Sequence, residues 1–424
     1  MLDSDATVAA PAPGRLDRQL ILGILAGQFG TAINTVSLVL VAFPMAAAEL
    51  SPSSKEWSLG MLTGVHALVL MVVAPLCGML SDRCTCSFGM RRPFILIGSA
   101  LACVSMFVMG SSSGLAALQL GNVLHAVGTG IFVGGFAAVV PDQVPHPVRA
   151  RILGGIAAMT ILAGALSAIV LPSLMNHQLL MFALPGVAGF ACSVVLIALL
   201  RDRRQSAADV ATGGPLWAGL GEQVRIRPWA VPDFSWAWSA KFLMTMAGAF
   251  TTTYGIYFLT DQLGVGDHEL PGFVTATGLV GLATAVIGAL IGSWASDRFG
   301  IRKKLVFYSS LVVAAGAVII SLAPGVGVYF LGMAVTGLAT GILMPVDGAL
   351  VIDVLPGEGT ESGKYMALSG LADSIPRSVG PMLAPMVVAV GGLTPLGGYP
   401  VLYLAGAALA IVGGLLVRRI NGSC

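Results

Sequence analysis

Charged residues are scarce in this sequence. Of its 424 residues, 10% are Asp, Glu, Lys or Arg, whereas 56% are hydrophobic, and the mean hydropathy is +0.90. Soluble domains carry about 25% charged residues, so soluble cores would leave too much apolar mass facing water. Lipid is the alternative solvent, in which a spanning helix needs about 20 mostly apolar residues. The composition therefore predicts an all-α, polytopic membrane protein.

Several other signals are missing as well. The net charge of +2 gives no reason to expect a nucleic acid as partner, and the 55 glycines show no collagen-like period. The sequence has no phosphate-binding G-x-x-x-x-G-K-[ST] loop, and its Ser, His and Asp residues lack a nucleophile motif. None of the six cysteines lies in a predicted outward loop, and the C-x-C at Cys84 and Cys86 has no second ligand pair nearby. We therefore expect no enzyme activity, no metal, no disulfide framework and no cofactor.

Long apolar runs give twelve candidate membrane spans. They cover residues 20–48, 57–80, 93–112, 114–140, 152–175, 178–200, 234–260, 271–295, 304–323, 326–352, 366–390 and 398–417. Of the 22 Lys and Arg residues, 19 fall on the side of both termini, and Lys55 alone falls in a loop on the other side. The positive-inside rule then predicts a multi-pass protein of the plasma (cytoplasmic) membrane with both termini in the cytoplasm.

One loop sequence occurs twice. Residues 81–92 read SDRCTCSFGMRR after span 2, and residues 296–303 read SDRFGIRK after span 8. A weaker repeat, which contains Asp142 in the first copy and Asp353 in the second, follows spans 4 and 10. Internal repeats of this kind are common in transporters. The repeat predicts five segments: a cytoplasmic tail (1–19), a six-helix bundle (20–200), a cytoplasmic linker (201–233), a second six-helix bundle (234–417) and a short tail (418–424).

The two loop copies resemble the signature Gly-x-x-x-Asp-Arg-x-Gly-Arg-Lys of the major facilitator superfamily, although Ser293 replaces the first glycine in the second copy. The resemblance covers essentially the whole chain. It implies twelve helices in two six-helix bundles that alternate access between the two sides of the membrane. It also implies a gating role for the matching residues, which are Asp82, Arg83, Arg91, Arg92, Asp297, Arg298 and Arg302.

The chemistry of such a gate can be read from the residues themselves. A carboxylate at a cytoplasmic helix end can cap a facing helix and pair with neighbouring arginines. By family analogy Asp82 would contact the start of span 11, and Asp297 the start of span 5, in the outward-open state only. The alternative is that these charged residues merely fix the topology.

A narrower resemblance lies in the first copy. Residues 81–94, including the four extra residues 84–87, are similar to the corresponding loop of plant sucrose transporters and related sugar–proton symporters. Those symporters carry an acidic residue and an arginine in span 4, where this chain has Gln119, Asn122 and His125. Span 5 lacks the Gly-Pro signature of the family's drug antiporters. The resemblance thus implies sugar–proton symport, with efflux of a drug or natural product as the alternative.

Four ionisable residues lie within the predicted spans, all in the second half: Lys241, Asp347, Asp373 and Arg377. Such residues are costly in a bilayer and usually face the bundle interior or a water-filled path. Asp373 and Arg377 are four residues apart, so they share a helix face and can pair. We interpret the set either as a network in which protonation of Asp347 or Asp373 is coupled to transport, or as a static ion-pair cluster.

The spans of the first half are uncharged but polar. In the family fold, spans 1, 4, 7 and 10 line a central cavity, which makes their polar faces candidates for solute contact. These candidates are Gln28, Thr31, Asn34, Thr35, Asn122, His125, Lys241, Thr245, Thr252 and Tyr254. His125 is also a candidate proton carrier, since imidazole titrates near neutral pH; a buried, structural histidine is the alternative. Tyr254 could stack on a sugar ring or anchor the span at the interface.

These observations predict a monomeric secondary active transporter that works by alternating access. A proton gradient is the expected driving force, and the bilayer, protons and a small polar solute such as a sugar or glycoside are the expected partners. A drug efflux antiporter is the alternative within transport. A non-transporting relative, such as a sensor or an assembly factor for a membrane complex, is the alternative of another class.

Overall fold

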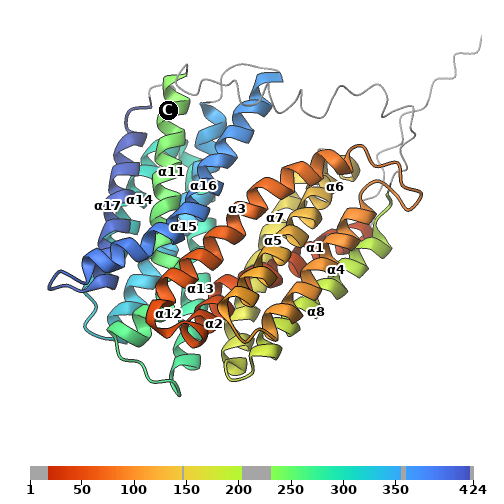
Figure 1. Ribbon diagram of the computed structural model, residues 1–424. Helices are drawn as coiled ribbons and strands as arrows, with labels where there is room; N and C mark the ends of the chain where they lie inside the picture. The colour runs from red at the N-terminus through yellow and green to blue at the C-terminus, as the bar shows by residue number, and fades with distance from the viewer. Residues whose placement is uncertain (1–17, 146–147, 203–230, 355–359, 421–424) are drawn as a thin grey trace, which may run out of the picture.

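The computed structural model describes residues 18–145, 148–202, 231–354 and 360–420, and every regular element within these ranges is helical (Figure 1). The elements of the first half are α1 (Arg18–Ser37), η1 (Leu38–Ala42), α2 (Phe43–Leu50), η2 (Pro52–Ser54), α3 (Lys55–Ser81), α4 (Arg92–Gly110), α5 (Leu115–Ala137), α6 (Val139–Gln143), α7 (Arg149–Val170), η4 (Leu171–Leu174) and α8 (Gln178–Leu199). Most of the predicted tails and linker lies outside the described residues.

The elements of the second half are α11 (Pro232–Thr253), α12 (Gly255–Tyr257), η6 (Phe258–Gln262), α13 (Leu270–Phe299), α14 (Arg302–Ser321), α15 (Val326–Asp353), α16 (Thr360–Gly391) and α17 (Gly398–Val417). We call the end of the molecule that holds Arg18 and Val417 the terminal end. The opposite end, with the loops 263–269 and 392–397, is the far end.

Ten helices among the described residues are long and apolar enough to cross a membrane. The pair Pro232–Thr253 and Gly255–Gln262 forms an eleventh span that is bent by 46°. The twelfth predicted span is α16, whose 32 residues include the charged Asp373 and Arg377 and three internal prolines. These residues lower its hydropathy, although its length is ample. The predicted twelve-helix fold is confirmed.

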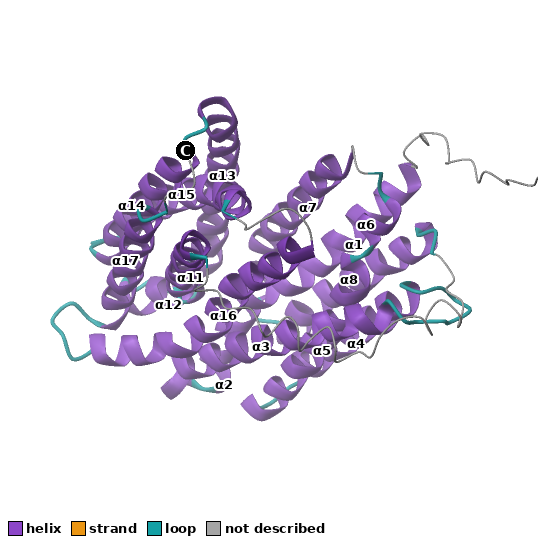
Figure 2. Cartoon of the chain, turned by 90° about the horizontal axis from the view of Figure 1, so that it is seen from above, coloured by secondary structure: helices purple, strands orange, loops and turns teal. Residues whose placement is uncertain are grey.

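The two halves repeat the same packing. In the first half α5 packs on α3 and α4, whereas α8 packs on α1 and α4. In the second half α15 packs in the same way on α13 and α14, whereas α17 packs on α11 and α14. Figure 2 shows the two resulting bundles side by side. The sequence repeat therefore corresponds to two six-helix bundles with equivalent helix neighbours.

Glycines bring some of these helices into close contact. A Cβ atom added to Gly98 of α4 would lie 2.6 Å from the carbonyl oxygen of Gly128 on α5, and one added to Gly128 would lie 2.6 Å from the Ala102 nitrogen. Small residues let backbones approach in this way where lipid provides no hydrophobic drive for helix association. Larger side chains at Gly98 or Gly128 would force α4 and α5 apart.

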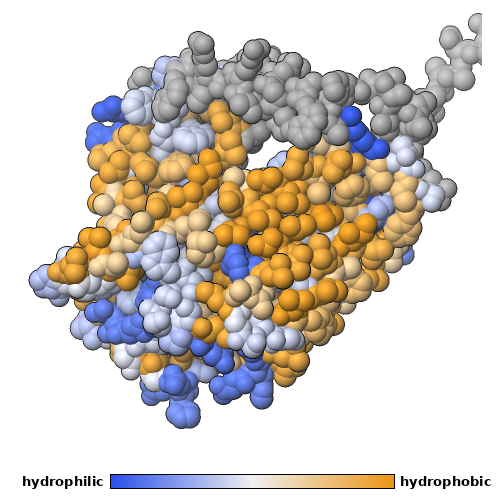
Figure 3. Space-filling view, in the orientation of Figure 1, coloured by the Kyte–Doolittle hydropathy of each residue, from blue (hydrophilic) through white to orange (hydrophobic). Residues whose placement is uncertain are grey.

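The bundles meet mainly along two helix pairs, α3 with α16 and α7 with α13. Each pair joins one helix from each bundle, and the two pairs are equivalent under the repeat. In Figure 3, apolar residues form a broad band across the helices of both bundles, and hydrophilic residues gather at the far end. Such a surface suits a multi-pass membrane protein.

Candidate functional site

The charged residues of the second half form one cluster. The Lys241 Nζ atom lies 3.3 Å from Asp347 Oδ2 and 3.0 Å from Asp373 Oδ2. The Thr245 hydroxyl donates a hydrogen bond to Asp373 Oδ1 at 3.2 Å. The participating residues come from α11, α15 and α16, so one ammonium group links three helices of the bundle.

This cluster borders a cavity of about 400 Å³. Its lining residues are Lys241, Met244, Thr245, Gly248, Ala249, Thr252, Thr340, Leu343, Met344, Asp347, Asp373 and Arg377. The positions 241, 245, 248 and 252 follow the helical period, which places them on one face of α11. The structure therefore brings all four intramembrane charges predicted from the sequence to one cavity.

The predicted pair between Asp373 and Arg377 is not formed. Asp373 binds Lys241 and Thr245 of the neighbouring helix instead. Arg377 lines the same cavity and is exposed, without an ion pair to a carboxylate of the described residues. The shared helix face was predicted correctly, but α11 supplies a closer cation for Asp373 than its own helix does.

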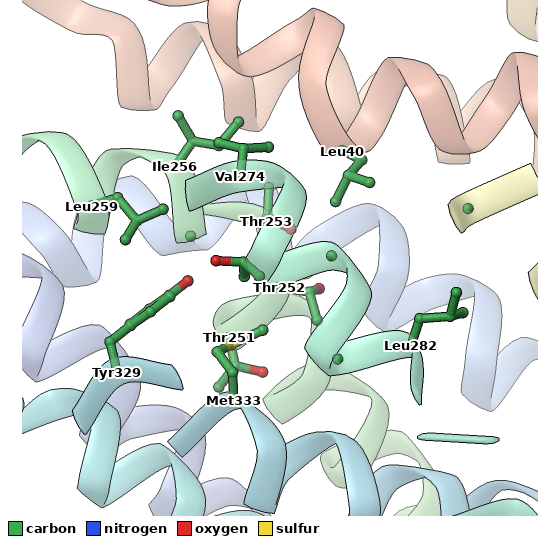
Figure 4. A pocket seen from close by; sticks show the side chains of 15 residues that line it. Leu40, Thr251, Thr252, Thr253, Ile256, Leu259, Val274, Leu282, Tyr329 and Met333 are labelled. Carbon is green, nitrogen blue, oxygen red and sulfur yellow. The ribbon is translucent and has the colours of Figure 1, made fainter. Parts of the chain in front are cut away.

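A second pocket of about 260 Å³ shares Thr252 with the charged cavity (Figure 4). Its lining is mostly apolar and includes Leu40, Ile256, Leu259, Val274, Leu282 and Met333. Thr251 and Thr252 donate their hydroxyl protons to backbone carbonyls one turn earlier in α11. The two pockets thus form a polar and an apolar site that meet at Thr252.

Helix irregularities shape this second pocket. Leu40 lies in the π-helical segment η1 of the first span, and Leu259 lies in the π-helical segment η6 of the seventh. Span 7 is bent where α11 ends and α12 begins at Gly255. A Cβ atom at Gly255 would lie 3.2 Å from the Tyr329 hydroxyl. Because π segments frequently mark functional sites, these breaks support a ligand-binding role for the pocket.

The polar candidates of span 1 lie mainly inside the first bundle. Gln28 donates to the Thr160 hydroxyl of α7 at 2.9 Å, and Thr35 donates to the Thr31 carbonyl. Thr31 and the buried Asn34 border a void of only about 10 Å³ between helices of the first bundle. None of these four residues lines either of the two larger pockets described above.

Asn122 and His125 differ more clearly from the prediction. Both are fully buried, and Asn122 binds α3 through a bond to the Leu62 carbonyl at 2.8 Å and a contact with His66 Nδ1 at 3.0 Å. The His125 ring stacks on His66 with centroids 5.3 Å apart. The polar face of span 4 therefore turns toward span 2 rather than toward the cavity. The structure favours the alternative of a buried, structural histidine.

Tyr254 also lies elsewhere than expected for a solute contact. Its ring is fully buried, and its hydroxyl lies 2.7 Å from the Pro381 carbonyl of α16 and 3.2 Å from the Glu56 carbonyl of α3. Pro385 has no N–H to donate to the carbonyl four residues earlier, which leaves Pro381 free to accept from Tyr254. Tyr254 therefore joins helices instead of facing a solute.

The first copy of the repeated loop, residues 81–92, forms a compact network at the terminal end. Arg91 is almost buried and contacts Asp82 Oδ1 at 2.6 Å, Asp142 Oδ2 at 2.9 Å and the Ser81 hydroxyl at 2.9 Å. The Asp202 carboxylate, which sequence reasoning missed, accepts hydrogen bonds from the backbone nitrogens of Arg91 and Arg92. Asp202 thereby caps the start of α4.

The other loop residues lie near these contacts or in the equivalent second loop. Arg92 donates to the Leu200 carbonyl, and Arg83 also has an interaction partner. In the second loop Arg302 pairs with Asp353 at 2.6 Å, and Arg298 is exposed. The side chain of Asp297 lies outside the described part of the chain. Asp82 pairs with Arg91 of its own bundle, and most side chains at the start of span 11, its predicted contact in the outward-open state, lie outside the described part of the chain.

A further charged cluster closes the far end, and of its members only Lys55 was singled out from the sequence. Lys55, the single basic residue predicted on that side, lies 2.6 Å from Asp261 Oδ2. The Tyr399 hydroxyl lies 2.7 Å from Glu56 Oε1 and 2.8 Å from Asp261 Oδ2. Lys55 and Glu56 belong to the first bundle, and Asp261 and Tyr399 to the second. These polar contacts therefore join the two bundles.

Comparison with known proteins identifies relatives of the whole chain. The sequence model of the Major Facilitator Superfamily matches residues 22–325 and 276–421. Among solved structures, a bacterial homologue of the human lysosomal transporter Spinster, in an inward-facing and occupied conformation, superposes with a TM-score of 0.73. It shares 15% sequence identity, and the match covers 94% of this chain and 95% of that one.

Two curated proteins are similar to this chain, one over a short segment and the other over most of its length. Sucrose transport protein SUT1 of Oryza sativa subsp. japonica is 36% identical over 110 residues, which are 26% of this chain and 19% of SUT1. The matched part is thus about a fifth of that relative's length. The tetracycline resistance protein of class G from Vibrio anguillarum is 26% identical over 290 residues, which are 64% of this chain and 67% of that protein.

Proposed function

The chain belongs to the Major Facilitator Superfamily, and on that premise we propose that it moves a small polar solute by alternating access, driven by a proton gradient. The chain is a membrane transporter, since its relatives are transporters and not enzymes. The observation that carries the proposal is the ammonium group of Lys241 between Asp347 and Asp373 on the larger cavity.

The conformation supports alternating access. Among the described residues, the polar side-chain contacts between the bundles lie at the far end, where Lys55 binds Asp261 and the Tyr257 hydroxyl donates to the Pro44 carbonyl at 2.9 Å. At the terminal end Asp82 binds Arg91 of its own bundle. With the terminal end in the cytoplasm, as the distribution of Lys and Arg favours, this is an inward-facing state.

The proton acts through charge balance at Lys241. One lysine is shared by two carboxylates, so a proton on either carboxylate leaves Lys241 with a single charged partner and gives the cavity, which Arg377 also lines, one more positive charge. The Asp373 side chain is 39% exposed against 14% for Asp347, so Asp373 is the more accessible proton acceptor. Its protonation would loosen the contact with Lys241 and let α16 move relative to α11. Buried charges in membranes commonly serve such proton relays.

The form of the cavity favours a glycoside over a bare sugar. Charged and hydroxyl groups border the larger pocket, whereas Leu40, Ile256 and Leu259 border the adjoining one. A solute with a polar head and an apolar group would contact both pockets at once. Sugar transport is also supported by the similarity of 110 residues to a sucrose transport protein.

Efflux of an amphipathic drug is the second candidate. The apolar pocket suits such a compound, and the similarity to a tetracycline resistance protein extends over 64% of the chain. The two candidates differ in direction: a symporter accumulates solute with the proton flow, whereas an antiporter expels it against that flow.

Uptake by proteoliposomes that contain the purified protein tests the proposal. Sugars, aryl glycosides and tetracycline are supplied with and without an inward pH gradient. We expect accumulation of a glycoside that an uncoupler abolishes. Accumulation that persists after the gradient is removed would contradict proton coupling, and expulsion of tetracycline would favour the antiporter.

A further inference from the structure

Three side chains from three helices meet at the far end. Glu56 is the second residue of α3, Asp261 lies in η6, and Tyr399 is the second residue of α17. The Tyr399 hydroxyl oxygen lies within 2.7 Å of Glu56 Oε1 and 2.8 Å of Asp261 Oδ2. Both distances are typical of strong O–H···O hydrogen bonds.

The number of protons does not match these two contacts. A phenol hydroxyl carries one proton and can donate it to one acceptor only, whereas an ionised carboxylate has no proton to donate. With both carboxylates ionised, one of the two short contacts would bring lone pairs together without a hydrogen between them. A second proton on one carboxyl group turns both contacts into hydrogen bonds.

The surroundings decide which carboxyl group carries that proton. Asp261 is bound by Lys55, whose Nζ lies 2.7 Å from Oδ1 and 2.6 Å from Oδ2, and it accepts a further bond from the Thr260 hydroxyl at 2.9 Å. These donors stabilise its ionised form. Glu56 forms no ion pair with a lysine or arginine among the described residues, so Glu56 is the group that takes the proton.

We propose that Glu56, Tyr399 and Asp261 form a proton-binding site that is complete only when the two bundles meet at the far end. In the complete site the Glu56 carboxyl donates to the Tyr399 hydroxyl, which donates to Asp261. Within the described ranges, the other titratable groups that face this site are Lys55, Tyr254 and Tyr257. Lys55 is bound to Asp261 and lies 4.8 Å from the Tyr257 ring centroid, and both phenols donate to backbone carbonyls.

The site acts as a regulator and not as the coupling group. Glu56 belongs to the first bundle, whereas Asp261 and Tyr399 belong to the second, so separation of the bundles breaks the chain of hydrogen bonds. The closed state of the far end thus binds one proton more than the open state, and its population rises as the pH falls. The bound proton returns to the side from which it came. The inference rests on the proposed alternating access but not on coupling at Asp373.

The distance between the bundles at the far end provides the readout. Spin labels are placed at Ser53 and Leu393, which are exposed at that end in the first and second bundle, after the six native cysteines are replaced. Pulsed electron paramagnetic resonance between pH 5 and 9 then gives the fraction of short distances. No solute is needed, so the outcome does not depend on the transported compound.

We expect the closed-to-open ratio to rise by up to about tenfold per pH unit as the pH falls, because one proton is bound. Glu56→Gln should remain closed across the range, since its amide N–H replaces the acid O–H. Tyr399→Phe should be more open at pH 5 and respond less to pH. Asp267→Asn, an exposed acid in the 263–269 loop, is the matched control and should follow the wild type.

Each variant is measured both with native Asp373 and with Asp373→Asn, so that titration in the cavity is separated from titration at the far end. The effect of Glu56→Gln should be the same in both backgrounds. A wild-type response that persists in Glu56→Gln or in Tyr399→Phe would overturn the proposal, as would a wild type that does not respond to pH. Failure of proton coupling at Asp373 would leave these results unchanged.

Discussion

Arg91 binds Asp142 in the first bundle as Arg302 binds Asp353 in the second, at 2.9 and 2.6 Å respectively. Both members of the pair recur at the same interval, from 91 to 302 and from 142 to 353. Each arginine lies two residues after a loop glycine, Gly89 or Gly300, that has a positive φ, and stands at the start of the following helix. The repeat thus preserves an ion pair between the loop and the end of the fourth helix of each bundle.

The two pairs differ in burial, which predicts different effects on stability. The Arg91 side chain is 5% exposed and also binds Asp82 and Ser81, whereas the Arg302 side chain is 32% exposed. We expect Arg91→Gln to lower the free energy of unfolding by about 1.5–3 kcal/mol, since charged hydrogen bonds are lost. Arg302→Gln should cost at most about 1 kcal/mol. Thermal unfolding in detergent compares the two, and equal losses would show that burial does not matter here.

Asp82 should affect transport more than stability. Its side chain is 61% exposed in this state and, within the described part of the chain, pairs with Arg91 alone; exposed ion pairs contribute little to folding. If Asp82 holds the start of span 11 when the terminal end closes, Asp82→Asn should slow solute uptake while expression and melting temperature stay nearly unchanged.

Initial uptake rates in proteoliposomes measure this effect. Asp267→Asn, an exposed acid at the far end, is the control for the loss of one negative charge and should transport at the wild-type rate. A wild-type rate in Asp82→Asn, with normal membrane insertion, would remove the gating role.

The bond between Tyr254 and Pro381 gives a stability test of the kink in α16. Tyr254→Phe leaves a buried carbonyl without a donor, which should cost about 1–3 kcal/mol. In a Pro385→Ala background the new N–H can donate to the Pro381 carbonyl, so Tyr254→Phe should cost clearly less. A double-mutant cycle from unfolding measurements tests this coupling, and a coupling energy near zero would show that Pro385 does not create the free carbonyl.

Local patterns and the repeat account for what the sequence predicted well. Apolar run length located the twelve spans, and the paired loops indicated two equivalent bundles. Helical period also placed Lys241, Thr245 and Thr252 on one face, and that face does border the cavity. These features depend on neighbours in the sequence or on comparison of the chain with itself.

The predictions that were wrong concern the rotation of helices about their axes and contacts between residues far apart in the sequence. Asn122 and His125 do share a helix face, but periodicity does not reveal toward which neighbour the face turns, and it turns toward His66 of α3. Likewise Asp373 pairs with Lys241 and not with Arg377, because the packing of α11 against α16 brings the Lys241 ammonium group within 3.0 Å of the Asp373 carboxylate. Glu56 and Tyr399 are 343 residues apart, so no local signal joins them.

The central claim is that protonation of Asp373 couples solute movement to the proton gradient. Asp373→Asn should keep its fold, since Lys241 retains Asp347 as a partner. Solute counterflow requires only a loaded carrier that reorients, whereas accumulation requires the protonation cycle. Asp267→Asn is again the matched control for the lost charge.

The most direct measurement is therefore the ratio of gradient-driven accumulation to counterflow for Asp373→Asn and the wild type in the same proteoliposome preparation. The account predicts that accumulation is abolished in Asp373→Asn while counterflow remains close to the wild-type rate. Accumulation at the wild-type level, or a parallel loss of both activities, would contradict it, because Asp373 would then serve only as a static partner of Lys241.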